Sequence, residues 1–168
     1  MTVIGLTGQT GSGKTTISNL LSQKGAKAID VDVLAREIVH PGGKVIKTIE
    51  ESFGTDVINS DGSLNRRKLA EIVFTDEDKL MLLNDITHPA LLDEVKSRLN
   101  EIKDSCGDSA IAVVDAAVLI DAQMVSLCDY VIVPECGEEK RVERIMLRDD
   151  LPRERAVERV QAQQNISY

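Results

Sequence analysis

The run Gly-Gln-Thr-Gly-Ser-Gly-Lys-Thr at residues 8–15 constrains the fold of this chain more than any other feature. It fits the pattern G-x-x-x-x-G-K-[S/T], which is typical of phosphate-binding loops. The run follows a β-branched stretch at residues 2–7, and apolar residues at helical spacing begin after Lys14. A strand, a glycine-rich turn and a helix in this order present backbone amides and a helix N-terminus to a phosphate group. The pattern therefore predicts an α/β fold that binds a phosphorylated ligand.

The residue types in this loop suit a nucleotide triphosphate and Mg²⁺. Glycines adopt backbone angles that are closed to other residues, and they let amides approach an anion closely. The Lys14 ammonium would reach the β- and γ-phosphates, and the Thr15 hydroxyl would ligate Mg²⁺. The alternative is a glycine-rich strand–helix turn whose lysine is merely solvated. The expected nucleotide-binding residues are Gly8, Gln9, Thr10, Gly11, Ser12, Gly13, Lys14, Thr15 and Thr16.

The composition excludes several classes of partner. The 168 residues carry a net charge of −8, which disfavours nucleic acid and anionic membranes as partners. Aromatic residues make up only 2%, so the chain has few platforms on which single-stranded nucleic acid could stack. The apolar runs are too short to span a bilayer, and the N-terminus lacks a basic leader. We expect a soluble, cytoplasmic protein whose three scattered cysteines are reduced, buried thiols.

Short apolar strands alternate with helical patterns along the chain. The expected strands are residues 2–7, 28–30, 110–115 and 129–133. Such an alternation implies a parallel sheet that is covered by helices on both faces. Asn65 and Asp76 are expected N-caps of successive helices. Asp32 is a further candidate cap, and Pro89 suits the first position of a long helix.

The stretch at residues 32–105 is too long for a simple connection between two parallel strands. We therefore predict that it is a helical insertion. The nucleotide-binding core would consist of residues 1–31 and 106–168, with a lid at about residues 138–155. The sequence gives no indication of the oligomeric state.

Three carboxylates lie at the carboxyl ends of the predicted strands. Asp30 and Asp32 come at the end of the second strand, and Asp115 ends the apolar run of the third. In a parallel sheet these ends face the crevice in which ligands bind. Asp32 would accept a proton from an attacking hydroxyl, or it is only a helix cap. Asp115 would contribute to a Mg²⁺ site, or it only caps the strand.

Cationic side chains are concentrated at residues 66–68 and 140–159. Those in the second segment are interleaved with acids, which is typical of a solvated, salt-bridged helical face. Phosphoryl transfer, however, needs cations that neutralise charge in the transition state, and Arg144 and Arg148 lie one helical turn apart. We predict that these two arginines act from a closing lid. Arg66 or Arg67 would bind a phosphate of the second substrate.

Several motifs in a fixed order resemble the dephospho-coenzyme A kinase family over almost the whole chain. Besides the phosphate loop, the likeness rests on Ile-Asp-Val-Asp at 29–32, Asp-Gly-Ser-Leu-Asn-Arg at 61–66 and His-Pro at 88–89. Residues 144–149 and 159–163 resemble the lid of that family and the helix after it. The resemblance implies a P-loop kinase fold and the ATP·Mg²⁺-dependent phosphorylation of the ribose 3′-hydroxyl of dephospho-coenzyme A.

The resemblance also implies roles for individual residues. Asp32 would be the general base, Lys14 and Thr15 would bind ATP and metal, and Arg144 and Arg148 would be lid cations.

The helical insertion would receive the coenzyme A moiety, with Arg36, Arg66 and His88 as candidate contacts. Taken alone, His88 would more often be a packed structural histidine.

The chain departs from the family pattern in two places. Ala-Val-Leu-Ile-Asp at residues 117–121 stands where the family usually has Pro-Leu-Leu-Phe-Glu. The sequence also stops at Tyr168, whereas the family continues with a further strand, which would flank the adenine pocket, and a final helix.

Two other functions fit parts of the pattern. One is a kinase of the same fold that acts on another nucleoside, nucleotide or small metabolite. The other is a non-catalytic nucleotide-binding switch, although the chain has no Asn-Lys-x-Asp motif for reading guanine.

Overall fold

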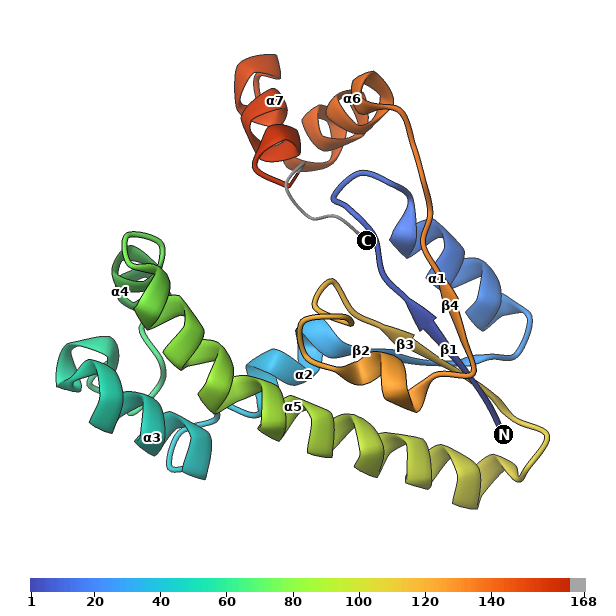
Figure 1. Ribbon diagram of the computed structural model, residues 1–168, viewed down its shortest axis with the longest axis horizontal. Coiled ribbons are helices and arrows are strands. Elements are labelled where there is room, and N and C mark those ends of the chain that lie inside the picture. The colour runs from blue at the N-terminus through green and yellow to red at the C-terminus, as the bar shows by residue number, and fades with distance from the viewer. Residues whose placement is uncertain (164–168) are drawn as a thin grey trace.

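The computed structural model describes residues 1–163, which form a four-stranded parallel sheet with helices around it (Figure 1). The strands are β1 (Thr2–Leu6), β2 (Lys27–Asp30), β3 (Ile111–Asp115) and β4 (Tyr130–Ile132). They lie in the order β2-β3-β1-β4, and each neighbouring pair is parallel. The predicted α/β fold with a parallel sheet is confirmed.

The register of the sheet brings the carboxyl ends of three strands to one edge. Leu6 at the end of β1 pairs with Asp115 at the end of β3. On the other side of β3, Asp30 at the end of β2 also pairs with Asp115. The chain leaves this edge from β1 into the phosphate loop and from β2 directly into a helix, so both segments begin where ligands of parallel sheets bind.

The described part of the chain contains seven α-helices. They are α1 (Lys14–Gln23), α2 (Val31–Glu37), α3 (Lys44–Phe53), α4 (Arg66–Val73), α5 (Glu77–Cys106), α6 (Glu138–Asp149) and α7 (Arg153–Gln161). Short 3₁₀ turns are formed by η1 (Thr55–Val57) and η2 (Met124–Leu127). α1 and α5 both contact the sheet, and Figure 1 shows them on opposite sides of it. Both faces of the central strands β1 and β3 are thereby largely removed from water, whereas most residues of the edge strands β2 and β4 stay exposed.

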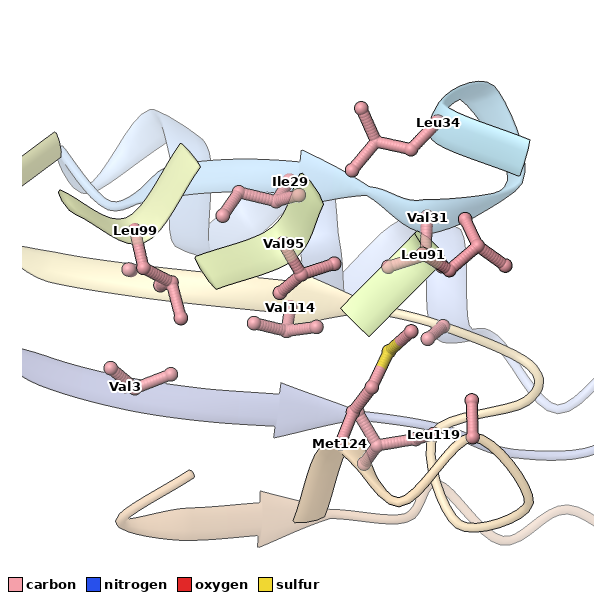
Figure 2. Close-up of a cluster of buried hydrophobic side chains, with 13 residues drawn as sticks. Val3, Ile29, Val31, Leu34, Leu91, Val95, Leu99, Val114, Leu119 and Met124 are labelled. Atoms are coloured by element: carbon pink, nitrogen blue, oxygen red, sulfur yellow. The ribbon is translucent and has the colours of Figure 1, made fainter. Parts of the chain in front are cut away.

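The main core lies between α5 and one face of the sheet. Figure 2 shows Leu91, Val95 and Leu99 of α5 on the side chains of Ile29 in β2 and Val114 in β3. All five side chains are buried, at 7% exposure or less. Their spacing of four residues along α5 forms the apolar stripe that the sequence predicts. This packing fixes α5 against the strands whose carboxyl ends carry the candidate site.

α5 is 30 residues long and contains Pro89 in its interior, so the prediction that Pro89 opens a helix is wrong. The helix starts after Asp76, whose carboxylate accepts a hydrogen bond from the Lys79 amide at 3.2 Å. A proline inside a helix removes one backbone hydrogen bond. The two halves of α5 pack into different clusters, Leu83 with α3 and α4 and Leu91 with the sheet. Burial on both sides of the proline compensates for the missing bond.

Two smaller apolar clusters hold the helices that lie away from the sheet. The cluster of the α3–α4 region consists of Val39, Ile49, Val57, Leu69 and Val73. The cluster between α6 and α7 consists of Val142, Ile145, Ala156 and Val160. Each helix group is therefore stabilised by side chains of its own.

Asp30, rather than Asp32, is the N-cap of α2. The Asp30 carboxylate accepts a hydrogen bond from the Val33 amide at 3.1 Å. Because β2 ends at Asp30, the two aspartates do not share one face of a continuing strand; Asp32 instead lies in the first turn of the helix with an exposed side chain. The other two predicted caps are confirmed, since Asn65 accepts from the Lys68 amide and Asp76 caps α5.

Within residues 1–163, none of the helices has the length and apolarity that crossing a membrane requires.

The three cysteines are free thiols. Cys106 is exposed, and Cys128 and Cys136 are only partly buried, so the prediction of buried thiols is wrong. Cys106 is the last residue of α5.

Candidate nucleotide and acceptor site

The phosphate loop connects β1 to α1 at the carboxyl edge of the sheet. Gly8, Gly11 and Gly13 have φ angles of 152°, 79° and 108°, a region that glycine adopts without strain. At Gly11 a Cβ atom would also lie 2.9 Å from the backbone oxygen of Arg141. The loop therefore requires glycine at this position both for its backbone conformation and for the close approach of α6.

A cavity of about 430 Å³ over this loop brings most of the predicted nucleotide-binding residues together. Its walls are formed by Gly8, Gln9, Thr10, Gly11, Gly13, Lys14, Thr15, Thr16, Asp32, Ala117, Arg144, Arg148 and Gln163. Of the predicted loop residues, Ser12 is outside these walls and is only 7% exposed. Its hydroxyl has no hydrogen-bond partner among residues 1–163.

Lys14 and Asp115 form an ion pair through Nζ and Oδ1. Asp115 is only 7% exposed at the end of β3, and a buried carboxylate is costly unless it is paired. Lys14 also lines the cavity over the loop. The pair thus holds an ammonium group at the wall of the cavity and gives the buried Asp115 carboxylate a partner.

Asp32 reaches the same cavity from α2. Because Asp30 caps the helix, the Asp32 carboxylate has no capping bond to make. It is exposed and lines the same cavity as the phosphate loop. Of Asp30 and Asp32, only Asp32 lines the cavity over the loop.

Two arginines of α6 line the cavity. Arg144 Nη1 donates a hydrogen bond to the Gly11 carbonyl at 3.0 Å. Arg148 donates from Nε and Nη2 to Asp149 at 2.7 and 2.8 Å, and Arg159 donates to the same carboxylate at 2.6 Å. The bond from Arg148, followed by the positive charges of Arg148 and Arg159, holds the pKa of Asp149 below its ordinary value. Asp149 therefore fixes one side of the Arg148 guanidinium.

A second cavity, of about 330 Å³, lies among the helices of residues 31–91. Asp32 and Val31 form part of its wall, so Asp32 borders both cavities. Arg66 and His88 also line it, and most of its other side chains are apolar. The structure thus brings Asp32, Arg66 and His88 together, whereas Arg36 is exposed and lies outside the walls of both cavities.

Two residues that contact the phosphate loop are absent from the sequence-based set. Arg141 is 4% exposed and bonds to the Thr10 carbonyl, although its mixed-charge surroundings in sequence predict a solvated helical face. Gln163 accepts a hydrogen bond from the Thr10 amide at 2.7 Å. The one signal available for Arg141 is its position one helical turn before Arg144. Nothing local to Gln163 indicates this contact.

The chain has a phosphate loop at the carboxyl edge of a parallel sheet, and a carboxylate and arginines of a helix pair face this loop. These features define a P-loop kinase. The chain matches the family described as Dephospho-CoA kinase over residues 2–167. The chain belongs to the dephospho-CoA kinase family.

Proteins named dephospho-CoA kinase in two bacteria are similar to this chain. The one from Carboxydothermus hydrogenoformans is 38% identical over 161 residues, which are 96% of this chain and 77% of that protein. The one from Bacillus cereus is 40% identical over 161 residues, which are 96% of this chain and 80% of that protein.

Solved structures share the fold. That of TT1252 from Thermus thermophilus matches with a TM-score of 0.76 at 28% identity, covering 98% of this chain and 81% of that one. Dephospho-CoA kinase from Campylobacter jejuni matches with a TM-score of 0.64 at 23% identity, covering 96% of this chain and 79% of that one. The second likeness concerns the fold alone.

Proposed function

We propose that this protein transfers the γ-phosphoryl group of ATP to the ribose 3′-hydroxyl of dephospho-CoA, giving CoA and ADP. The observation that carries this proposal is the position of Asp32 in the shared wall of two cavities. One cavity is built on the phosphate loop, and the other lies among the helices of the insertion. A carboxylate between a nucleotide and an acceptor is where a phosphotransferase requires a base.

The phosphate loop and α6 would bind ATP. The loop amides and the N-terminus of α1 would bind the phosphates, and Lys14 would leave Asp115 partly or wholly to contact the β- and γ-phosphates. Arg144 and Arg148, which already line the cavity, would stabilise charge on the transferring group.

Asp32 would act as the general base. In that role its carboxylate takes the proton of the 3′-hydroxyl while the hydroxyl oxygen attacks the γ-phosphorus. The bond between that phosphorus and the β,γ-bridging oxygen breaks, and the electron pair stays on ADP. The exposure of Asp32 and its lack of a capping bond are consistent with a carboxylate that is available to the acceptor.

The residues beside Lys14 fit a Mg²⁺ ion. Mg²⁺ prefers hard oxygen ligands and is usually bound by one or two protein groups together with substrate phosphates. Thr15 lines the cavity, and the Asp115 carboxylate lies against the ammonium of Lys14, the residue before Thr15. Thr15 would hold the ion directly and Asp115 directly or through water. The ion would supply charge neutralisation at the β- and γ-phosphates.

The second cavity would receive the coenzyme A moiety. Its mostly apolar wall suits the pantetheine arm, and Arg66 and His88 would contact polar or phosphate groups. Arg36 lies outside this wall in the structure, so a contact from Arg36 would require the bound substrate to extend beyond the cavity. By this division residues 32–105 form the acceptor-binding part, and residues 1–31 and 106–168 form the nucleotide-binding part, with a lid at about residues 138–155.

A coupled assay of ADP release tests the proposal. The protein is incubated with ATP and Mg²⁺, and with dephospho-CoA, adenosine, a nucleoside monophosphate or no acceptor. We expect ADP release that depends on dephospho-CoA, with CoA as the second product. A preference for adenosine or a monophosphate would assign another acceptor. ATP binding without acceptor-dependent ADP release would indicate a nucleotide-binding switch, and either result would overturn the proposal.

A further inference from the structure

Arg141 is a buried cation beside the phosphate loop. It lies in the first turns of α6 with a relative exposure of 4%. Its Nε donates a hydrogen bond to the Thr10 carbonyl at 3.0 Å, and its Nη1 donates to Oε1 of Gln9 at 2.5 Å. Both acceptors are neutral, and Nη2 has no hydrogen-bond partner in the described part of the chain. Burying a guanidinium among neutral acceptors is costly, which singles out Arg141 among the residues that contact the loop.

The bond to the Thr10 carbonyl determines where the next amide points. A trans peptide unit is planar, and its C=O and N–H groups point in opposite directions. Because Arg141 holds the Thr10 oxygen toward α6, the Gly11 N–H is directed away from α6. Gly11 lines the cavity over the loop. Arg141 therefore sets the orientation of a backbone donor at the place where phosphates would bind.

Other contacts hold the same three loop residues. The Thr10 amide donates to Oε1 of Gln163 at 2.7 Å, and the Gln9 side chain donates to the Gln163 carbonyl at 3.1 Å. Arg144 donates to the Gly11 carbonyl. Residues 9–11 are thus bonded to both ends of the α6–α7 pair. Among the three residues that bond to the loop, Arg141 is the most buried. Its guanidinium, a single planar group, contacts both Gln9 and Thr10.

The backbone of α6 also lies directly against the loop. A Cβ atom at Gly11 would be 2.9 Å from the Arg141 oxygen and 3.1 Å from its Cα. The first turns of α6 could not move away from the loop without breaking both this contact and the two side-chain bonds of Arg141. This part of the lid and the phosphate loop therefore behave as one unit.

We propose that Arg141 is a positioning residue for nucleotide phosphates: it fixes the Thr10–Gly11 peptide so that the Gly11 amide faces the bound anion. The proposal rests on the proposed ATP-binding function and names a determinant of affinity that lies outside the phosphate-loop motif. A Lys at this position would keep the charge but lack the planar fork that bonds Thr10 and Gln9 together.

The test measures ATP binding directly, by titration calorimetry without acceptor, in Arg141→Gln and Arg141→Lys. Charged hydrogen bonds of this kind contribute enough that we expect the Kd for ATP to rise about tenfold or more in Arg141→Gln. The Kd of Arg141→Lys for ATP should lie between the values of wild type and Arg141→Gln.

In steady-state assays of Arg141→Gln the KM for ATP should rise in parallel with this Kd, and the KM for dephospho-CoA should stay unchanged within about twofold. A merely structural role would lower the melting temperature without this separation of the two KM values.

Arg155→Gln is the matched control, because Arg155 is an exposed α7 arginine that pairs with Glu158. It should bind ATP as wild type does. An equal loss in Arg155→Gln, or an ATP affinity within about twofold of wild type in Arg141→Gln, would overturn the proposal. If Arg141→Gln is unfolded at the assay temperature, wild-type affinity in Arg141→Lys overturns it instead. Failure of the wild type to phosphorylate dephospho-CoA would refute the proposed function but leave this binding test intact.

Discussion

Lys14 and Asp115, 101 positions apart in sequence, form an ion pair at the carboxyl edge of the sheet. The pair joins the first residue of α1 to the last residue of β3. It places the ammonium that we propose to bind phosphate beside the carboxylate that we propose for Mg²⁺. ATP and Mg²⁺ binding would exchange this contact for one from lysine to phosphate and one from carboxylate to metal.

Replacing Lys14 by Ala should nearly abolish phosphoryl transfer, because Lys14 is the one lysine among the described residues that line the cavity. We expect turnover to fall by about two orders of magnitude or more, the usual effect of losing one charge-stabilising donor. ADP release at saturating dephospho-CoA measures the effect. Lys47→Ala, at an exposed position of α3, is the control. Wild-type turnover in Lys14→Ala would contradict the assignment of the phosphate loop.

Replacing Asp32 by Asn should lower turnover by about 10²- to 10⁴-fold, as expected for loss of a general base. ATP affinity, measured by calorimetry, should change little, because the phosphate loop is untouched. Asp30→Asn is a matched control: Asn caps helices as well as Asp does, so α2 and activity should both be preserved. If Asp32→Asn turned over at the wild-type rate, the proton would have to go to another group.

Gly11→Ala should weaken ATP binding by about tenfold or more, since a disturbed loop loses charge-assisted bonds to phosphate. The change introduces both a strained φ and a contact of 2.9 Å with the Arg141 oxygen. Gly107 provides the comparison, because it has the same φ of 79° but open space around its Cβ position. Gly107→Ala should be destabilised by about 1–3 kcal/mol of backbone strain and retain full ATP affinity. Equal ATP affinities in the two variants would show that the contact with α6 is unimportant.

Leu119→Ala should lower the free energy of unfolding by about 2–5 kcal/mol, the usual cost of a cavity at a buried leucine. Leu119 is fully buried in the main core, beside Met124 near the carboxyl ends of the strands (Figure 2). Urea denaturation measures the change. Leu147→Ala, at a side chain that is 87% exposed on α6, should stay within about 0.5 kcal/mol of wild type. A similar loss in both variants would argue against the core packing described here.

The stability of the α6–α7 pair should depend on acid through Asp149. Hydrogen bonding from Arg148 lowers the pKa of this carboxylate in the folded protein. A lowered pKa stabilises the folded state above the ordinary pKa of aspartate, and this stabilisation is lost as the pH falls through the folded-state value. Asp149→Asn should therefore be less stable than wild type at pH 7, with the difference disappearing in acid.

Urea denaturation from pH 7 to pH 3 measures this difference. Asp150→Asn is the control, because it removes a neighbouring carboxylate that is outside the Arg148–Asp149–Arg159 contacts, at a left-handed position that Asn accepts. A constant stability difference between Asp149→Asn and wild type over the whole pH range would disprove the linkage.

Much of the fold follows from local patterns. Local residues predict the strand before the phosphate loop and the helix after it. They also predict the helix caps at Asn65 and Asp76. The structure confirms each of these predictions. Pro89 shows the limit of this reasoning. A proline is a helix start by local propensity, yet here two packing interactions on either side of it keep α5 continuous.

The sequence by itself determined the phosphate loop, the parallel sheet and the family, because backbone propensity and motif spacing are properties of contiguous residues. Only the tertiary structure decided which of Asp30 and Asp32 caps α2, that Asp32 borders two cavities, and that Arg141 is buried against Thr10. The physical reason differs between them. The cap depends on where β2 ends, because Asp30 accepts a hydrogen bond from the Val33 amide three residues further on. The surroundings of Asp32 and Arg141 depend on packing against segments that lie far away in sequence, which no local pattern contains.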